Sequence, residues 1–216
     1  MRGTFSKHGP VMTIAMQFVV ALAFVLSLGL SAQPAVAATP AEQFVSDNVQ
    51  KGLAILNNAQ LSKDQRRTEF RAFLLNLTDI KAIAEYTLGQ YRRTASPDDI
   101  NAYDAAFRDY ALSVYQSYFN KYSGQTLQMN GSYALAPDES VVKTVMVDAK
   151  KPSSKPLEVN FRVLSHGARM VVVDFAVEGV WIRELERNDF TGFLGQNGGN
   201  VALLTQNLRT KTQQFH

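Results

Sequence analysis

The stretch Met170–Glu184, which reads MVVVDFAVEGVWIRE, decides the fold class of this sequence. Side chains alternate between the two faces of a strand, so Val171 and Val173 are expected on one face and Met170 and Val172 on the other. Both faces are apolar, which is typical of a strand that is covered on both sides. One face requires a protein core. Either packed helices or a bound apolar ligand would cover the second face.

Three further segments have the two-residue period of strands, at about residues 125–135, 141–149 and 157–165, and the quoted stretch supplies a fourth at 169–178. The breaks between them, APDES, KKPSSKP and HG, are short and rich in turn-forming residues. Consecutive strands joined by short turns form an antiparallel meander. The second and fourth segments are apolar on both faces, which predicts central positions.

The sequence before residue 124 carries helix signals instead. Capping boxes at Thr39–Glu42 and Ser62–Gln65 predict two helix starts, and Asp79 and Ser96 open a short and a long helix. Two more helices are predicted after the strands, one from about Arg187 and one after GQNGGN. The first two helices have apolar stripes, formed by Val45, Val49, Leu53 and Leu56 and by Phe70, Phe73, Leu74 and Leu77.

These elements predict an α+β fold, in which helices pack around a single twisted antiparallel sheet of four to five strands. We find no internal repeat, low-complexity tract or linker in the sequence from residue 38 onward. Residues 38–216 are therefore expected to form one domain.

Residues 1–37 are predicted to be a cleavable signal peptide rather than part of the fold. Arg2 and Lys7 precede a long apolar run, and Ala35-Val36-Ala37 fits the small-residue cleavage rule. A retained membrane anchor is the alternative interpretation, because the apolar run is long for a signal peptide. The sequence has no Cys, so an exported chain has no disulfide and no thiolate nucleophile, and we expect a soluble periplasmic protein.

Composition and motifs argue against nucleic-acid binding and against most catalytic chemistries. The formal charge of +3 falls to +1 without Arg2 and Lys7, so the mature chain has no basic excess for nucleic acid. Only His166 and His216 remain, neither at metal-ligand spacing, and phosphate-binding glycine loops and nucleophile motifs are absent. We therefore expect no catalytic residue, no metal and no cofactor.

Two weaker matches to catalytic patterns are interpreted as structural residues. Ser140–Lys143 matches S-x-x-K but begins a strand, whereas that chemistry needs the Ser at a helix start. Asp174 and Glu178 are four apart on one predicted strand and would share a face as a carboxylate pair. We expect them instead to hold the strand end near Arg187.

The long helix after Ser96 is rich in aromatic residues. Its apolar stripe includes Tyr103, Phe107 and Tyr110, and Tyr115 begins a second apolar edge. A Tyr ring is buried only where its hydroxyl finds a partner or the edge of a wet cleft, so this helix suits a pocket wall that opens to water. An ordinary core would have the same pattern, and the residues leave both interpretations open.

Five motifs, taken in order, resemble the MlaC family of periplasmic phospholipid-binding proteins, also called the toluene-tolerance family. They span nearly all of the mature chain, and a close branch associated with hopanoid synthesis and transport is similar too. Arg92 and Met170 stand where the family often has Trp, and Trp181 stands where it often has Ser, which puts the exact ligand in doubt. The motifs are LGQYRRTASPDD (Leu88–Asp99), FNKYSGQ (Phe119–Gln125), VVDFAVEGVWI (Val172–Ile182), Arg187 with Phe190, and GGNVALL (Gly198–Leu204).

The resemblance implies a non-catalytic, monomeric carrier with an apolar cavity enclosed by the helices and the sheet. It implies phospholipid or a related lipid as the ligand, and shuttling between an inner-membrane ABC transporter complex and an outer-membrane lipoprotein complex that maintains outer-membrane lipid asymmetry. A hopanoid-associated carrier and an interaction module without a ligand are the alternatives.

By this hypothesis, lipid tails cover part of the second face of the strand quoted first. We expect the cavity to be lined by residues of the aromatic helix and of the sheet, although each would serve equally well in an ordinary core. The predicted lining residues are Tyr91, Phe107, Tyr110, Tyr115, Val145, Val147, Val159, Phe161, Met170 and Val172.

Overall fold

The structure is a computed structural model that describes residues 37–119, 122, 124–148, 150, 155–167 and 169–214, with the side chains of residues 115–119 outside the description. The predicted signal peptide lies outside the described residues except for its last position, Ala37. The fold described below is that of the unit Ala38–His216. Within these ranges, no helix combines the length and the apolar character needed to cross a membrane.

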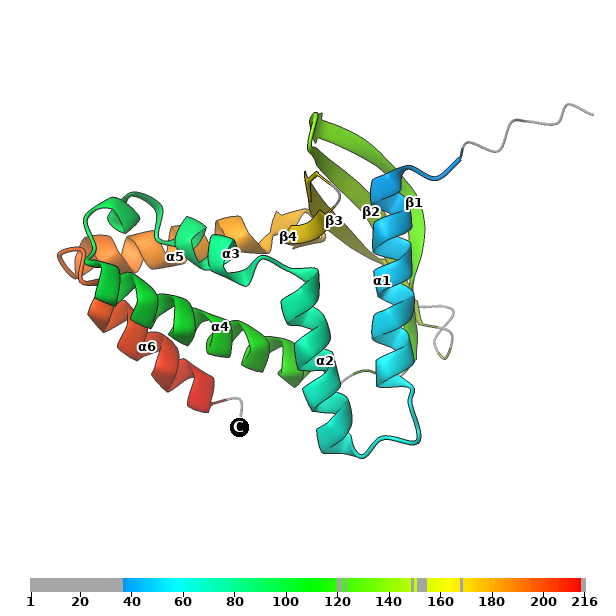
Figure 1. The fold of residues 1–216 in the computed structure, drawn as a ribbon, viewed down its shortest axis with the longest axis horizontal. Coiled ribbons are helices and arrows are strands. Elements are labelled where there is room, and N and C mark those ends of the chain that lie inside the picture. Colours follow the sequence, from blue (N-terminus) through cyan, green and yellow to red (C-terminus); the bar gives the residue numbers. More distant parts are fainter. Residues whose placement is uncertain are drawn as a thin grey trace, which may run out of the picture. The chain divides into compact units, whose positions relative to one another are not determined.

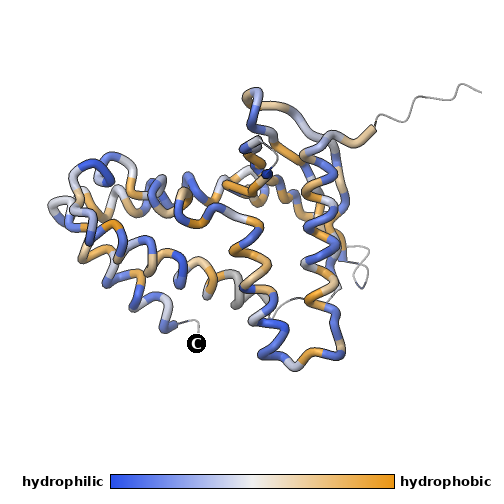
Figure 2. The backbone as a smooth tube through the Cα atoms, in the orientation of Figure 1, coloured by the Kyte–Doolittle hydropathy of each residue, from blue (hydrophilic) through white to orange (hydrophobic). Residues whose placement is uncertain are grey.

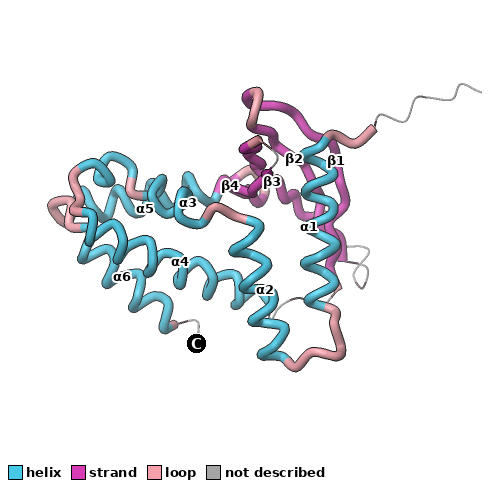
Figure 3. Tube along the Cα trace, in the orientation of Figure 1, coloured by secondary structure: helices cyan, strands magenta, loops and turns pink. Residues whose placement is uncertain are grey.

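Helices precede and follow a single sheet, in the predicted order (Figure 1). The five strands form one antiparallel sheet in the order β1-β2-β3-β4-β5, which confirms the predicted α+β class (Figure 3). The elements are α1 (Pro40–Leu56), α2 (Lys63–Leu77), α3 (Ile80–Thr87), the 3-10 helix η1 (Gly89–Arg93), α4 (Pro97–Phe119), β1 (Gln125–Ala136), β2 (Glu139–Asp148), β3 (Leu157–His166), β4 (Arg169–Val177), β5 (Val180–Trp181), α5 (Ile182–Gln196) and α6 (Val201–Gln213).

Both predicted capping boxes are present. The Thr39 hydroxyl accepts the Glu42 N–H at 3.2 Å, and the Glu42 carboxylate accepts the Thr39 N–H at 2.9 Å. Ser62 and Gln65 exchange the corresponding bonds at 3.2 and 2.8 Å. The caps predicted for α3 and α4 form as well. Each cap satisfies N–H groups that have no partner inside the helix and so fixes where the chain turns.

Strand β4 departs from the simple alternation that its sequence predicts. Its pairing with β3 places Val163 opposite Val172 but Arg162 opposite Asp174, so Val173 is the extra residue of a β-bulge. Four consecutive residues of this stretch are buried. The predicted division of β4 into two faces is therefore wrong beyond Val172, because a one-residue shift moves every later side chain to the other face.

Helix α5 begins at Ile182, earlier than the predicted start near Arg187. Trp181 at its N-cap position makes no side-chain cap. Asp174 of β4 caps the helix instead, because its Oδ1 accepts the Arg183 N–H at 2.9 Å. The carboxylate also lies at the positive end of the helix dipole, which is a favourable position for an acid. Asp174 therefore joins β4 to Arg183 rather than to Arg187.

The second acid of this motif does not share a strand face with Asp174. Glu178 lies in the turn after β4 with φ of +49°. Its carboxylate accepts the Glu158 N–H at 2.8 Å and lies 3.4 Å from Nζ of Lys155. The predicted position of both acids on one strand face is thus wrong, since the strand ends at Val177, before Glu178.

Two clusters of buried residues hold the fold together. The larger, which we call the helical core, lies among α3, α4, α5 and α6, with rings in edge contact: the centroids of Phe107 and Phe190 are 6.3 Å apart at 84°. The smaller, which we call the sheet cluster, packs α1 on the sheet. The helical core contains Ala84, Leu88, Tyr103, Ala106, Phe107, Ala111, Phe190, Leu194, Val201, Leu204 and Leu208, and the sheet cluster contains Ala41, Val45, Val142 and Val163.

Candidate binding cavity

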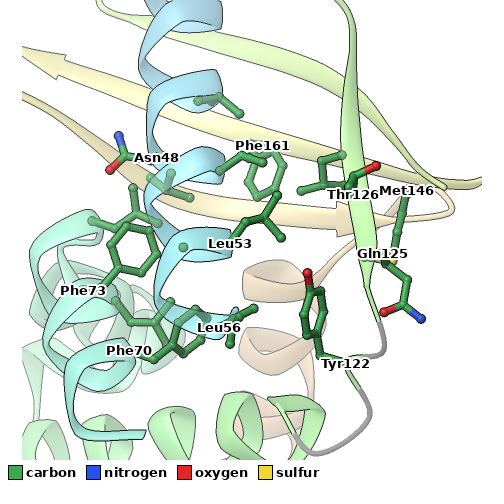
Figure 4. A pocket seen from close by; sticks show the side chains of 17 residues that line it. Asn48, Leu53, Leu56, Phe70, Phe73, Tyr122, Gln125, Thr126, Met146 and Phe161 are labelled. Atoms are coloured by element: carbon green, nitrogen blue, oxygen red, sulfur yellow. The ribbon is translucent and has the colours of Figure 1, made fainter. Parts of the chain in front are cut away.

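A cavity of about 490 Å³ lies between α1, α2 and the sheet (Figure 4). Ligand pockets in proteins typically enclose about 300–1,000 Å³, so this volume is that of a binding site. Its walls are formed by Val45, Asn48, Val49, Gly52, Leu53 and Leu56 of α1, by Phe70, Phe73, Leu74 and Leu77 of α2, by Gln125, Thr126, Leu127, Met146, Phe161 and Val172 of the sheet, and by Tyr122.

The two helical walls come from the apolar stripes of α1 and α2. Figure 2 shows hydrophobic and hydrophilic residues alternating along both helices, as in amphipathic helices. No residue of α2 is buried, so its stripe borders the cavity instead of filling a core. Gly52 lets the helices approach, because a Cβ atom there would lie 3.3 Å from Cε1 of Phe73.

The polar side chains of the cavity wall already have partners of their own. The Asn48 amide donates to the Phe44 carbonyl at 2.8 Å, and the Gln125 amide donates to Asp148 at 3.3 Å. The Tyr122 hydroxyl accepts a hydrogen bond from the Asn57 amide at 3.1 Å. None of the lining residues that the structure describes is charged. The cavity is therefore built to bury an apolar group and offers it no ion pair.

The structure brings only part of the predicted lining set to this cavity. Phe161 and Val172 line it, from β3 and β4. Phe107 lies in the helical core with 1% of its surface exposed, and Tyr110 packs against the same core. The side chain of Tyr115 lies outside the described residues. The aromatic helix α4 packs mainly against α6 and α3, and its Phe107 ring meets Phe190 of α5, so the described aromatic residues predicted from it belong to a packed core.

The remaining predicted residues lie elsewhere on the sheet and the helices. Val145 and Val147 flank Met146 on β2, so they point away from the face on which Met146 meets the cavity. Val159 is buried, and its carbonyl accepts a hydrogen bond from Thr144. Met170 packs on the sheet cluster. Tyr91 packs against the helical core.

A charged cluster beside β4 lies apart from the cavity. Burial raises the pKa of Glu186 to about 7, an effect that repulsion from Asp174 and Asp189 increases and attraction to Lys211 opposes. Burial likewise raises the pKa of Asp174, against the stabilising bond from the Arg183 N–H. In the described part of the chain, no group of three or more His, Asp or Glu side chains is placed to hold a metal ion.

Arginine side chains lie in this cluster, and Nε of Arg183 is 3.8 Å from Oδ2 of Asp174. The guanidinium groups of Arg183 and Arg187 lie 4.0 and 4.6 Å from the ring centroid of Tyr86, whose hydroxyl donates to Glu184. The cluster thus connects α3 with α5, and through Asp174 with β4. Its geometry is that of a joint between the helices and the sheet.

Comparison with known proteins identifies the family of this chain. Residues 46–210 match the family described as MlaC protein. The chain belongs to the MlaC family. Its fold also occurs in the solved structure of a phospholipid-binding protein from Ralstonia solanacearum in complex with a phospholipid, with a TM-score of 0.70 and 20% identity, over 82% of this chain and 99% of that one. The family and the fold class expected from the sequence are therefore confirmed.

Three of the five motifs that resemble the MlaC family meet on the helical side of the molecule, in η1, α5 and α6. Gly89 has φ of +55°, and a Cβ atom there would lie 2.9 Å from Cγ2 of Thr191 and 3.5 Å from Nε of Arg187. The ring of Tyr91 lies against Gly199, where a Cβ atom would be 3.1 Å from Cδ1. These close approaches require glycine, so the MlaC motifs fix how η1, α5 and α6 meet.

The predicted lining set contained none of the residues of α1 and α2 that form most of the cavity wall. The stripes of α1 and α2 were identified from the sequence, yet nothing in them distinguished a cavity wall from a packed face. Tyr122 and Gln125 also belong to a motif that resembles the family, and they lie at the cavity.

Proposed function

We propose that this protein is a periplasmic lipid carrier that holds phospholipid acyl chains in the cavity between α1, α2 and the sheet. It would carry lipid between an inner-membrane ABC transporter complex and an outer-membrane lipoprotein complex, and so help to maintain outer-membrane lipid asymmetry. The observation that carries this proposal is the cavity itself: about 490 Å³, with described walls that are almost entirely apolar and hold no charged residue. Membership of the MlaC family and the phospholipid bound by the Ralstonia protein support it.

Elementary energetics explain why such a carrier is needed. Burial of one methylene group gains about 0.8 kcal/mol, so an acyl chain of about fifteen methylenes costs about 12 kcal/mol to expose to water. A lipid therefore does not cross an aqueous compartment unaided at a useful rate. A cavity lined by Leu53, Phe73 and Phe161 would remove most of this barrier, and it requires no reaction.

In this function, the cavity binds the lipid and no catalytic centre takes part. Among the described residues, the lining of the cavity includes no His, Ser, Cys or carboxylate. The lipid head group would remain at the polar margin near Tyr122 and Gln125. A hopanoid is the second candidate ligand, because the motifs RTASPDD and YSGQ also resemble the hopanoid-associated branch of the family.

A pair of tryptophan variants tests whether this cavity holds the lipid. Leu53→Trp fills the cavity from α1, whereas Val147→Trp adds the same ring on β2 away from the cavity-lining face. We expect Leu53→Trp to reduce co-purified lipid several-fold at an unchanged circular dichroism spectrum, and Val147→Trp to leave it unchanged. Undiminished lipid in folded Leu53→Trp would show that the lipid lies elsewhere.

A further inference from the structure

We propose that Arg66 of α2 and Lys150, which follows β2, bind the phosphate of the lipid head group at the margin of the cavity, so that the carrier prefers anionic phospholipids to zwitterionic ones. This inference rests on the proposed function and adds to it the class of head group that the site accepts. We call the two cations, together with the polar side chains of Asn57, Tyr122 and Gln125, the cationic margin.

Polar side chains gather at one end of the cavity, where the turn after α1 meets the start of β1. The Asn57 amide donates to the Tyr122 hydroxyl at 3.1 Å, and the Gln125 amide donates to Asp148 at 3.3 Å. Leu56, the last residue of α1, lies at the same end as Tyr122 (Figure 4). Because the tails of a bound lipid occupy the apolar walls, its head group belongs where polar groups begin.

Arg66 lies beside this end of the cavity. Its Nη1 donates to the Leu56 carbonyl at 3.3 Å, and both Leu56 and Phe70, one helical turn after Arg66, line the cavity. Arg66 forms no ion pair with a described residue, unlike Arg67, which pairs with Asp64 at 3.5 Å. Its Nε has no hydrogen-bond acceptor among the described residues either. The guanidinium therefore keeps unused donors, and such a group binds phosphate oxygens well.

Lys150 reaches the same margin from the sheet. A Cβ atom on Gly124 would lie 3.9 Å from Nζ of Lys150, and Gly124 directly precedes the lining residue Gln125. Lys150 is exposed and has no acid partner in the described part of the chain. The neighbouring Asp148 already has two donors, because Oδ1 accepts the Lys150 N–H at 2.9 Å and Oδ2 accepts the Gln125 amide. The ammonium group is therefore the group at this point that is open to a ligand.

Two unpaired cations at one margin favour a head group with a net negative charge. They attract the phosphate of any phospholipid, but they repel the ammonium group that a zwitterionic head group carries beside its phosphate. Phosphatidylglycerol has the phosphate without that ammonium group. Exposed ion pairs contribute little each and are screened by salt, so the expected preference is about fivefold and not absolute.

Mixed vesicles test this preference. They contain equal amounts of palmitoyl-oleoyl-phosphatidylglycerol and palmitoyl-oleoyl-phosphatidylethanolamine, which have the same tails and lie in the same surface. Native mass spectrometry identifies the lipid that delipidated protein takes up from them. Arg66→Gln with Lys150→Gln removes both cations of the margin. Arg93→Gln with Arg209→Gln is the matched control, because it removes two exposed cations of η1 and α6 that form no ion pair with a described residue.

We expect the wild type and the control to take up about fivefold more phosphatidylglycerol than phosphatidylethanolamine, and the margin variant to take up equal amounts. Raising the NaCl concentration from about 50 to about 500 mM should reduce the wild-type preference, since salt screens exposed charges. Equal uptake of the two lipids by the wild type would overturn the inference, and so would an unchanged preference in the margin variant. Failure of the wild type to take up either lipid would refute the proposed function instead.

A single substitution covers the case in which loss of the bond between Arg66 and Leu56 prevents folding. Lys150→Glu changes an exposed side chain and places an acid at the margin. It should abolish the preference for phosphatidylglycerol while total lipid uptake stays the same, because the apolar walls are unaltered. A fivefold preference that persists in folded Lys150→Glu would contradict the assignment of Lys150.

Free phosphate offers the same oxyanion as the head group, and a titration separates the two sources. Inorganic phosphate is added to delipidated wild-type protein, and the backbone amide signals of Tyr122 and Gln125 are followed by NMR. We expect no saturable shift, because without the tails the two cations hold a phosphate only weakly. Saturable shifts together with equal uptake of the two lipids would assign the margin to free phosphate and overturn the inference.

Discussion

The helical core and the cavity walls are built from the same kinds of residue but use them in opposite ways. Phe107 of α4 is 1% exposed and meets Phe190 edge to face, whereas Phe73 of α2 borders empty space and belongs to a helix with no buried residue. The helical core is packed as in a normal protein interior, whereas the cavity walls leave space that a ligand could occupy. Stability and binding capacity are therefore located in different parts of one domain.

The largest expected contrast comes from one substitution made in both regions. Phe107→Ala should lower the free energy of unfolding by about 3–5 kcal/mol, because it leaves a cavity in a packed core. Phe73→Ala should lower it by only about 1 kcal/mol, since its ring already faces a cavity, while it weakens lipid binding. Urea unfolding of both variants without lipid checks the difference. Equal losses would mean that the cavity side is packed like the core.

The next effect is the pH dependence of stability that a buried acid on the helical side produces. The pKa of Glu186 is raised to about 7 by burial, above the value of about 4.3 expected in the unfolded chain. The folded protein thus binds more protons than the unfolded protein between these values, so its stability falls as the pH rises from about 4.3 to about 7. The loss is at most about 4 kcal/mol.

The Glu186→Gln variant isolates this contribution. Its unfolding free energy should decline less between pH 5 and pH 8, where only the raised pKa of Asp174 continues to act in the same direction. Thermal unfolding across this pH range gives the comparison. A wild-type protein whose stability rises over the same interval would contradict the burial of an acid at this position.

The smallest predicted effect compares two glycines with positive φ. Gly89→Ala combines φ of +55° with a Cβ atom 2.9 Å from Thr191 Cγ2, so it should cost about 2–3 kcal/mol. Gly131 of β1 has φ of +87° but open space around it, so Gly131→Ala should cost only about 1 kcal/mol. The midpoints of chemical unfolding rank the two variants. A larger loss for Gly131→Ala would show that the joint around Gly89 is not tightly packed.

The sequence predicted the scaffold better than the cavity, and the reason is physical. Capping boxes and turns act locally, so the starts of α1 and α2 and the meander of β1 to β4 were predictable. The cap on α5 was not, because it comes from Asp174 on a neighbouring strand. The bulge at Val173 was also unpredictable, since it leaves the alternating pattern of residues in the sequence unaltered and appears only in the pairing of β4 with β3.

The cavity was harder to predict because an amphipathic stripe records only which side of a helix avoids water. Leu53 and Phe73 have the pattern of core residues, and whether protein or empty space lies opposite depends on how far the partner elements stand apart. Aromatic richness pointed instead to α4, whose Tyr103 finds its hydroxyl partner in Thr87 at 2.6 Å inside the helical core. The need for a hydroxyl partner was met by a neighbouring helix and not by a wet cleft.

The central claim is that the cavity between α1, α2 and the sheet carries lipid, and one measurement tests it most directly. Mass spectrometry of a solvent extract from the purified protein, beside the native mass of the intact complex, identifies any bound lipid and its stoichiometry. We predict one lipid per chain in the wild type and a several-fold loss in Leu53→Trp. A folded wild-type protein that contains no lipid and takes up none from added vesicles would contradict the carrier function and favour an interaction module.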